Sequence, residues 1–275
     1  MNTLLDAAVR CFAGNLRHCL QALALFAAGT CLVHAGTTRI TATYDLDLNV
    51  DSPSRLLMQP DVKSVLIGAG FGILNGNVHV GVVEETLTFT DNKFDIRSVG
   101  KPAEIVAKVF KNATIVRQSD GNISAGRFFT ARYMERRGES YEKTAVIDTR
   151  GKKVHFYDGQ NLVADSPLPG GVTDNLSFPY AFLGRKMPAA PIHAVATDGR
   201  TMRPMTFDVS EEMLVIGKQN YPAVKLRRRK IESDDAGIEL WFLRGSNFPL
   251  RVRVEMSQKY GVIVDQTLRG APAVL

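Results

Sequence analysis

Cysteine is scarce in this sequence and confined to its beginning. Of 275 residues, three are cysteines, at positions 11, 19 and 31. If the chain is cleaved after Ala35, the mature protein contains none. Disulfide bonds, a thiol nucleophile and cysteine-ligated zinc or iron–sulfur sites are then excluded. The fold must be held together by its own core, for which the chain is long enough.

A hydrophobic run long enough to span a bilayer is also missing from the N-terminal segment. The apolar stretch 19–28 follows Arg10 and Arg17 and falls short of the roughly 18 residues that a membrane-spanning helix needs. Val33 to Ala35 then supplies a cleavage site before Gly36, in the order typical of a secretory signal peptide. An uncleaved N-terminal anchor is the alternative.

We therefore expect a signal peptide over residues 1–35, followed by a single β-rich domain over 36–275 that is located in the periplasm. The last residues, 270–275, are expected to form a flexible tail.

Charge of one sign is only mildly in excess. Removing residues 1–35 takes away two arginines and one aspartate, which lowers the net charge from +6 to +5. This excess favours anionic lipid head groups or acidic polymers as partners and allows contact with a membrane surface. The sequence has no recognisable nucleic-acid motif, so we expect no nucleic-acid partner.

Alternation of apolar and polar residues is the dominant pattern of the mature chain. Residues 38–48 alternate as a half-buried strand, and Asp91-Asn92 separates two further alternating segments as a hairpin turn. Further turn signals lie at Asp120-Gly121, Arg137-Gly138, Arg150-Gly151, Asp158-Gly159 and Asp198-Gly199. This predicts a mainly β protein with a curved antiparallel sheet, a half-barrel or open barrel, with one or two short helices. A two-sheet sandwich is the alternative.

Two segments depart from this alternation. Pro102 and the apolar spacing over 102–110 predict a helix. Thr173 and Asp174 predict the N-cap and first turn of a second helix, which Pro179 would shorten or bend.

Motifs that would indicate an enzyme are lacking. The glycine-rich stretch 64–72 fails as a dinucleotide fingerprint because Ile73 stands where the third glycine belongs. His79, His155 and His193 are scattered over strand-like segments without metal-ligand spacing. Carboxylates such as Asp148, Asp158, Asp174 and Glu239 form no acid–base pair by local spacing. We therefore expect no enzymatic activity, no metal and no cofactor.

The densest charge run of the chain is Arg227 to Lys230. On a strand, alternation places Arg228 and Lys230 on one face and Arg227 and Arg229 on the other. One interpretation is a solvated edge strand, since edge strands use cationic side chains to discourage pairing. The other is a basic rim that meets phosphate or carboxylate head groups.

The order of several landmarks resembles the exported bacterial family called domain of unknown function 3108, over residues 85–268. These landmarks are the 90–93 hairpin, the helical segment 104–110, Ser119-Asp120-Gly121, the turn at 148–154, Asp174-Asn175-Leu176-Ser177, Leu240-Trp241, the segment 248–252 and the final strand 261–268. Pro179 and Tyr180 depart from the family's uninterrupted helix after the Asp-x-Leu-Ser motif. The resemblance implies a fold similar to the half-barrel carriers of the LolA and LolB type and assigns no catalytic residue.

The sequence thus favours a periplasmic protein that binds or carries an apolar or lipid-like ligand of the envelope. The alternatives are a structural or protein-interaction module without a small ligand and, as a third hypothesis, a hydrolase of an envelope polymer. In the first hypothesis, aromatic side chains line a concave face and the basic run meets the head group. The residues assigned to this site are Tyr133, Phe156, Phe207, Trp241, Arg227, Arg228, Arg229 and Lys230.

Overall fold

Strands dominate the computed structural model of the protein. It describes residues 37–50, 77–109, 114–139, 141–231, 236–255 and 262–274. The expected signal peptide, its cleavage site and the glycine-rich stretch 64–72 lie outside these residues.

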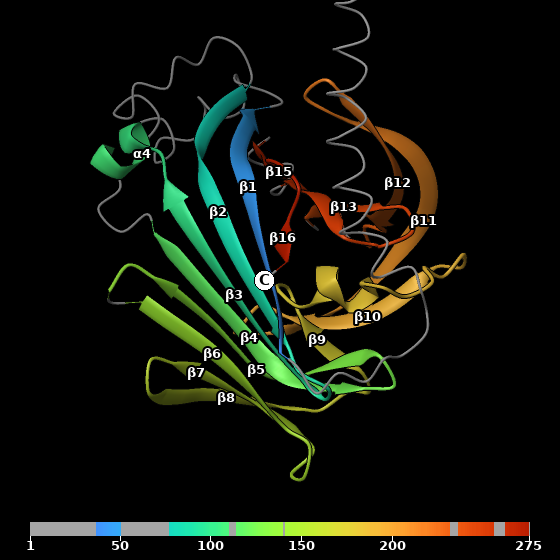
Figure 1. The fold of residues 1–275 in the computed structure, drawn as a ribbon. Helices are drawn as coiled ribbons and strands as arrows, with labels where there is room; N and C mark the ends of the chain where they lie inside the picture. The colour runs from blue at the N-terminus through green and yellow to red at the C-terminus, as the bar shows by residue number, and fades with distance from the viewer. Residues whose placement is uncertain are drawn as a thin grey trace, which may run out of the picture.

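The first half of the chain forms strands that follow one another as antiparallel neighbours (Figure 1). Their bounds are β1 Thr38–Val50, β2 Asn77–Phe89, β3 Lys93–Pro102, β4 Ile115–Ser124, β5 Arg127–Arg137, β6 Tyr141–Asp148, β7 Lys153–Asp158 and β8 Asn161–Pro167. The second half has the bounds β9 Val172–Asp174, β10 Ile192–Thr197, β11 Met202–Ile216, β12 Gln219–Arg228, β13 Gly237–Leu243, β14 Pro249–Glu255, β15 Val262–Leu268 and β16 Ala273–Val274.

All of these strands belong to one sheet, whose two ends are β8 and β9. Strand β1 lies in its middle, paired with β2 on one side and with β15 on the other. Only the β9–β10 pair is parallel among the described pairs. The sheet curves strongly without closing (Figure 1), which confirms the predicted antiparallel half-barrel. In the segment expected to be a flexible tail, Ala273 and Val274 form β16 against β1.

Local patterns account for many of these strands. In β3, the apolar residues Phe94 and Ile96 are buried while the residues between them are more exposed, as expected for a half-buried strand. The turn before β3 is closed by the Thr90 amide, which donates to the Lys93 carbonyl at 3.0 Å. The predicted hairpin at Asp91-Asn92 is therefore confirmed.

One predicted turn is wrong. Asp120 and Gly121 lie inside β4, where the pairing with β5 shifts register between them. A Cβ atom on Gly121 would lie 2.1 Å from the Phe129 carbonyl oxygen and 2.9 Å from Cε1 of Phe94. The glycine is therefore required by a close backbone approach at a β-bulge, not by a chain reversal.

The described part of the chain contains one α-helix, α4 (Glu104–Val109), within the segment predicted to be helical. No helix among the described residues has the length and apolar character needed to cross a membrane. The second predicted helix begins later than expected. Thr173 and Asp174 belong to β9, and the 3₁₀ helix η1 covers Phe178–Phe182 with Pro179 in its first turn.

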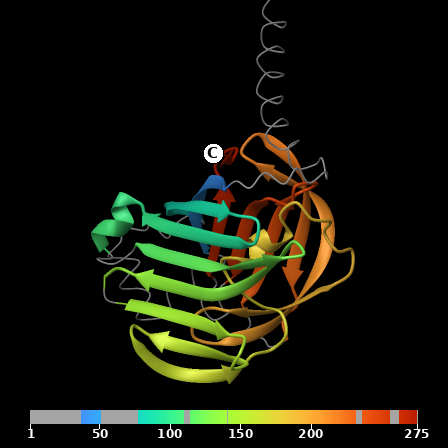
Figure 2. The ribbon, with the colours of Figure 1, turned by 60° about the horizontal axis from the view of Figure 1, so that its bottom comes forward.

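The concave side of the sheet is occupied by β9 and η1. Strand β9 lies against β5 as well as beside β10, and η1 is surrounded by strands of both halves (Figure 2). The aromatic ring of Phe178 in η1 stacks on Phe207 of β11 at 5.1 Å between centroids. Tyr180 packs against Phe248 at 6.0 Å. The core is thus built between the two halves of the curved sheet, with β9 and η1 as its filling.

Candidate functional site

The four aromatic residues assigned to the ligand site are all buried. Tyr133 and Trp241 belong to the largest core cluster, Phe207 to a second cluster and Phe156 to a third. The structure therefore places them in the packed core and does not gather them around one described cavity. Their role in ligand binding stays a prediction.

Trp241 also has a different kind of environment from Phe207. Its indole nitrogen donates to Glu212, and the Lys225 ammonium lies 4.6 Å from its ring centroid. The guanidinium of Arg251 lies 5.4 Å from the same centroid. These are cation–π contacts on a strand face that carries charged residues, whereas Phe207 belongs to an apolar cluster with Phe178 and Phe242.

The basic run lies in the interior of the sheet. Strand β12 pairs with both β11 and β13, so the expectation of an edge strand is wrong. The predicted alternation holds for Arg227, which is exposed, and Arg228, which is buried; Arg229 and Lys230 follow the end of β12 and are both exposed. Arg228 donates to the Ala236 carbonyl at 3.2 Å. The sequence alone could not show that β12 has a second neighbouring strand, β13, on the side away from β11.

Acidic residues of β11, β13 and β14 compensate the rest of the run. Arg229 donates to the Asp208 carboxylate from Nε at 2.8 Å. Lys230 lies 2.8 Å from Glu255, and Arg227 lies 3.6 Å from Glu239. Exposed pairs of this kind contribute little to stability, but they leave less uncompensated positive charge for a head group than the run of four cations suggested. The role of the run in ligand binding stays a prediction.

The buried carboxylate of Asp174 holds the residues that connect β9 with η1. Its Oδ1 accepts hydrogen bonds from the amides of Leu176 at 2.9 Å and Ser177 at 2.8 Å. Its Oδ2 accepts from the hydroxyls of Ser119 and Ser177 at 2.6 Å and of Thr130 at 2.7 Å. The contacts to Ser119 and Thr130 attach β9 to β4 and β5, so this carboxylate holds the filling segment against the sheet.

A second buried carboxylate, Glu85 of β2, holds the other end of η1. It accepts from Ser98 at 3.1 Å, from Gln266 at 3.2 Å and from the Tyr180 hydroxyl. The Tyr180 hydroxyl also lies 3.0 Å from that of Tyr44. Burial raises the pKa of Glu85 above its ordinary value, and the hydrogen bonds oppose that rise only in part. The carboxyl group is therefore more easily protonated than an exposed glutamate.

Glu85 is one end of a polar row that crosses the concave face. Direct cross-strand pairs connect Glu85 with Ser98, Ser98 with Arg117, Arg117 with Glu135, and Glu135 with Lys143. Lys143 in turn pairs with Asp158, so the row runs over β2 to β7. Two residues farther along each strand lies a second, almost fully buried row, which consists of Leu87, Ile96, Ser119, Tyr133, Ala145 and Phe156.

Three cations meet at Glu135 in this row. Arg117 Nε lies 2.8 Å and Arg137 Nε 2.9 Å from its carboxylate oxygens, and Lys143 Nζ lies 3.5 Å away. The Tyr133 hydroxyl donates to the same carboxylate at 3.3 Å. Burial alone would raise the pKa of Glu135, but the three cations dominate and lower it to about 2. Glu135 is therefore ionised throughout the physiological range.

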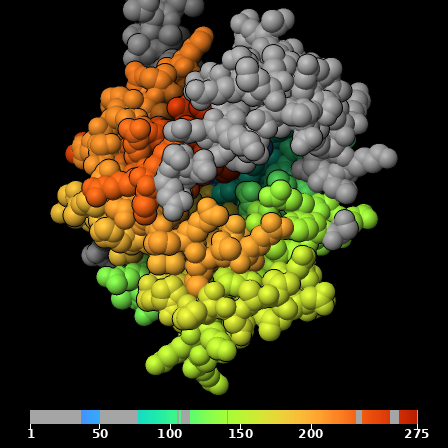
Figure 3. All heavy atoms as spheres, turned by 180° about the vertical axis from the view of Figure 1, so that it is seen from behind, coloured from blue at the N-terminus to red at the C-terminus, as the bar shows by residue number. Residues whose placement is uncertain are grey.

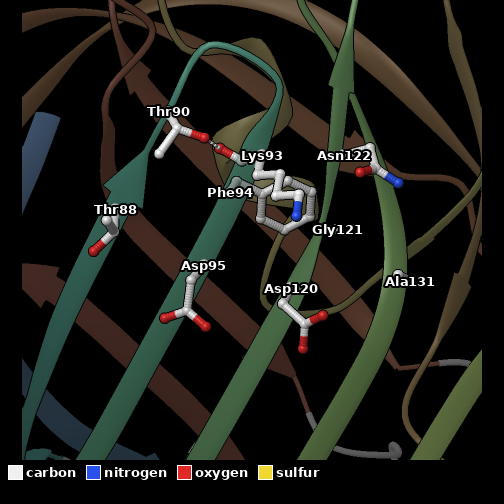
Figure 4. Close-up of a pocket in the computed structure, with 9 residues that line it drawn as sticks. All are labelled: Thr88, Thr90, Lys93, Phe94, Asp95, Asp120, Gly121, Asn122 and Ala131. Atoms are coloured by element: carbon white, nitrogen blue, oxygen red, sulfur yellow. Dashed lines mark hydrogen bonds between the residues drawn. The ribbon is translucent and has the colours of Figure 1, made fainter. Parts of the chain in front are cut away.

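A pocket of about 420 Å³ is hollowed into the sheet around Asp95 of β3 and Asp120 of β4 (Figure 4). These two carboxylates are direct cross-strand partners, and partial burial, together with the proximity of Asp95, raises the pKa of Asp120. The Gln118 amide donates to Asp95 at 2.8 Å. Phe94 and Gly121 also line the pocket (Figure 4).

The three histidines lie apart from one another. His155 contacts Asp165 at 2.6 Å, His79 contacts Asp47 at 3.0 Å, and His193 contacts Thr206 at 3.1 Å. Within the described ranges, no three histidine, aspartate or glutamate side chains are arranged to hold a metal ion.

No family model and no curated protein matches the chain. A similar solved structure is that of a β-barrel-like protein of domain of unknown function DUF1849 from Brucella abortus, with a TM-score of 0.47 and 11% sequence identity. The match covers 86% of this chain and 98% of that chain. This likeness carries no argument about the site or the function. Membership of domain of unknown function 3108 stays a proposal, because no family model matches.

Proposed function

We propose that this protein is an exported, non-enzymatic binding protein of the bacterial envelope, and that its partner is an extended protein segment that adds to strand β8. The observation that supports this proposal is the edge of the sheet formed by Asn161–Pro167. On the inner side, β8 pairs with β7, and no strand of the described residues pairs with its outer side. The atoms of this region form the lower end of the molecule and are open to view (Figure 3).

The side chains of β8 support the same proposal. Leu162 is 55% exposed and Val163, which lies at a register shift between β7 and β8, is 61% exposed, so two apolar side chains are accessible at this edge. Proteins discourage association at edge strands with lysine, inward-pointing charges, bulges or proline; β8 has a bulge at Val163 and ends at Pro167, but it carries no lysine. The charge of β8, Asp165, is already engaged by His155 and by Lys153 at 3.4 Å. A neutral, apolar segment would therefore pair with β8 by main-chain hydrogen bonds, with Leu162 and Val163 adding side-chain contacts.

The experiment is a charge substitution on this edge with a matched control. Val163→Lys places a cation on β8, while Val215→Lys places one on β11, where Val215 is also 61% exposed but the strand is not a neighbour of β8 in the sheet. A photo-crosslinker at Ala164 should trap one envelope protein in cells, and a synthetic peptide of the trapped segment should slow hydrogen exchange of the β8 amides. Val163→Lys should abolish both effects and Val215→Lys neither. Equal crosslinking in both variants, or no protection of β8 by the peptide, would contradict the proposal.

We propose an apolar or lipid-like ligand as a second candidate, because the filling of the concave face is a separable segment. The residues of η1 that occupy it include Phe178 and Phe182, whose rings lie 5.4 Å apart. An acyl chain gains about 0.8 kcal/mol per buried methylene group, so a long chain could replace these contacts if η1 moved out. Mass spectrometry of organic extracts of the purified protein tests this candidate. An extract without lipid, together with no uptake of an added fatty acid, would exclude it.

A further inference from the structure

Three cations surround Glu135, and one of the acidic groups near them is buried. Arg117, Arg137 and Lys143 all contact the Glu135 carboxylate. The other acidic groups of the polar row are Glu85, whose charge also acts on Arg117, and Asp158, the exposed cross-strand partner of Lys143. Three cations therefore face three carboxyl groups, and burial favours the neutral form of Glu85. With Glu85 neutral, the group carries a net positive charge.

The two arginines use only part of their hydrogen-bonding capacity. Each guanidinium donates to Glu135 through Nε, and no Nη group of either arginine donates to a described residue. Their side chains are accessible, with 36% of Arg117 and 53% of Arg137 exposed, whereas Glu135 and Lys143 lie beneath them almost completely buried. The buried carboxylate thus orients two partly exposed guanidinium groups.

This arrangement differs from that of the basic run on β12. There, Arg227, Arg229 and Lys230 have carboxylate partners on β13, β11 and β14, respectively. Around Glu135 one carboxylate is shared by three cations. A guanidinium fork binds the oxygens of phosphate or carboxylate in a bidentate manner, and a fixed fork loses little entropy on binding.

We propose that Arg117 and Arg137, oriented by Glu135 and supported by the charge of Lys143, form a binding site for the phosphate or carboxylate group of a small anionic ligand. The site lies on the concave face at β4, β5 and β6 (Figure 1). It is separate from strand β8, so it does not depend on the strand-addition proposal. The anionic group could belong to a free oxyanion or to the head of an amphiphile, and the experiment below distinguishes these two sources.

The test measures binding of inorganic phosphate and of dodecyl phosphate, below its micelle concentration, to the purified exported protein by isothermal calorimetry at low ionic strength. Wild-type protein should bind at least one of the two probes saturably, with affinity that falls as salt is added. Equal binding of both identifies the oxyanion alone as the ligand group. Binding of dodecyl phosphate only identifies an amphiphile. Both outcomes support the site.

Substitutions locate the binding. Arg137→Gln should lower the affinity for the probe at least tenfold. Arg137→Lys should lower it less, because the positive charge remains while the guanidinium fork is lost. The matched control is Arg229→Gln, which removes an arginine that is 52% exposed and also paired with a carboxylate; it should leave binding unchanged. Arg137 is the residue to vary because its exposure makes unfolding of the variant less of a concern than at Arg117. Failure of both probes to bind, or an Arg137→Gln variant that binds like the wild type, would overturn the proposal.

Discussion

Replacing Asp174 by alanine tests how the filling segment β9–η1 is held in the concave face. The carboxylate is completely buried and accepts five hydrogen bonds, two from backbone amides and three from hydroxyls. In Asp174→Ala, the hydroxyls of Thr130 and Ser177 keep each other as partners at 3.1 Å. Three donors lose the Asp174 carboxylate as their acceptor: the amides of Leu176 and Ser177 and the hydroxyl of Ser119.

The expected loss follows from these three donors. A buried donor without an acceptor costs about 1–3 kcal/mol, and the variant no longer has to bury a carboxylate, which offsets part of the sum. We therefore expect Asp174→Ala to lower the free energy of unfolding by about 3–5 kcal/mol, the range found when one partner of a buried charged network is removed. Asp174→Asn retains one carbonyl acceptor and should lose about 1–2 kcal/mol.

Urea denaturation at neutral pH measures these losses, and hydrogen exchange of the amides in η1 shows whether the segment itself has loosened. Asp198→Ala is the matched control, because Asp198 accepts from the amides of Arg200 at 2.9 Å and Thr201 at 3.0 Å in the same kind of turn near the surface. Water can replace that acceptor, so the loss should be about 1 kcal/mol or less. A loss below about 1 kcal/mol in Asp174→Ala, equal to that of the control, would refute the assigned role of the buried carboxylate.

Three further predictions concern stability and processing. Gly121→Ala should lower the free energy of unfolding by about 2–4 kcal/mol in urea denaturation, because the new methyl group meets the Phe129 carbonyl. The control is Gly100→Ala, whose added atom would lie 3.6 Å from its nearest neighbour and which should fold normally. Equal losses in the two variants would show that the bulge does not require glycine at position 121. Glu85 has a raised pKa when folded, so its stabilising contribution is complete below its unfolded pKa and is lost as pH rises through the folded value. Glu85→Gln should therefore gain stability relative to wild type as pH increases from about 4 to about 8, and a constant difference over this range would contradict the burial of an ionisable group. N-terminal sequencing of the exported protein should find Gly36 or a close neighbour as the first residue, and a mature chain that still includes the apolar stretch 19–28 would disprove cleavage.

Structural features that depend on residues close together in the chain could be predicted from the sequence. The hairpin at Asp91-Asn92 depends on residues within one turn, and the helix α4 depends on apolar spacing within six residues. The alternation of buried and exposed residues in β3 also follows from the local pattern. The curved antiparallel sheet was predicted because such signals repeat along the whole chain.

Structural features that depend on strands distant in the chain could not be predicted from the sequence. Asp120-Gly121 has the composition of a turn, but the approach of Phe129 places it in a bulge. Thr173 and Asp174 have the composition of a helix start, but Ser119 and Thr130 hold Asp174 in a strand.

The candidate sites depended even more on the register between strands. The basic run stood out as consecutive letters, yet its carboxylate partners lie on β11, β13 and β14. Conversely, Arg117, Glu135 and Lys143 are far apart in sequence and meet only through cross-strand pairing. A partial signal was present in Glu135 and Arg137, opposite charges two residues apart that must share one face of a strand.

The central position of β1 governs the order in which the sheet can be completed. Strands β2 to β8 follow β1 along the chain and can pair one after another, as can β10 to β15. The pairing of Leu48 with Val264 joins the two series across more than two hundred residues of chain. One edge of β1 therefore has no partner until nearly the whole chain has been synthesised. Closing such a long loop is slow, so an unpaired, half-apolar strand stays available for mispairing throughout synthesis. Joining β1 to β15 is therefore the step at which folding of this protein should depend most on protection from aggregation.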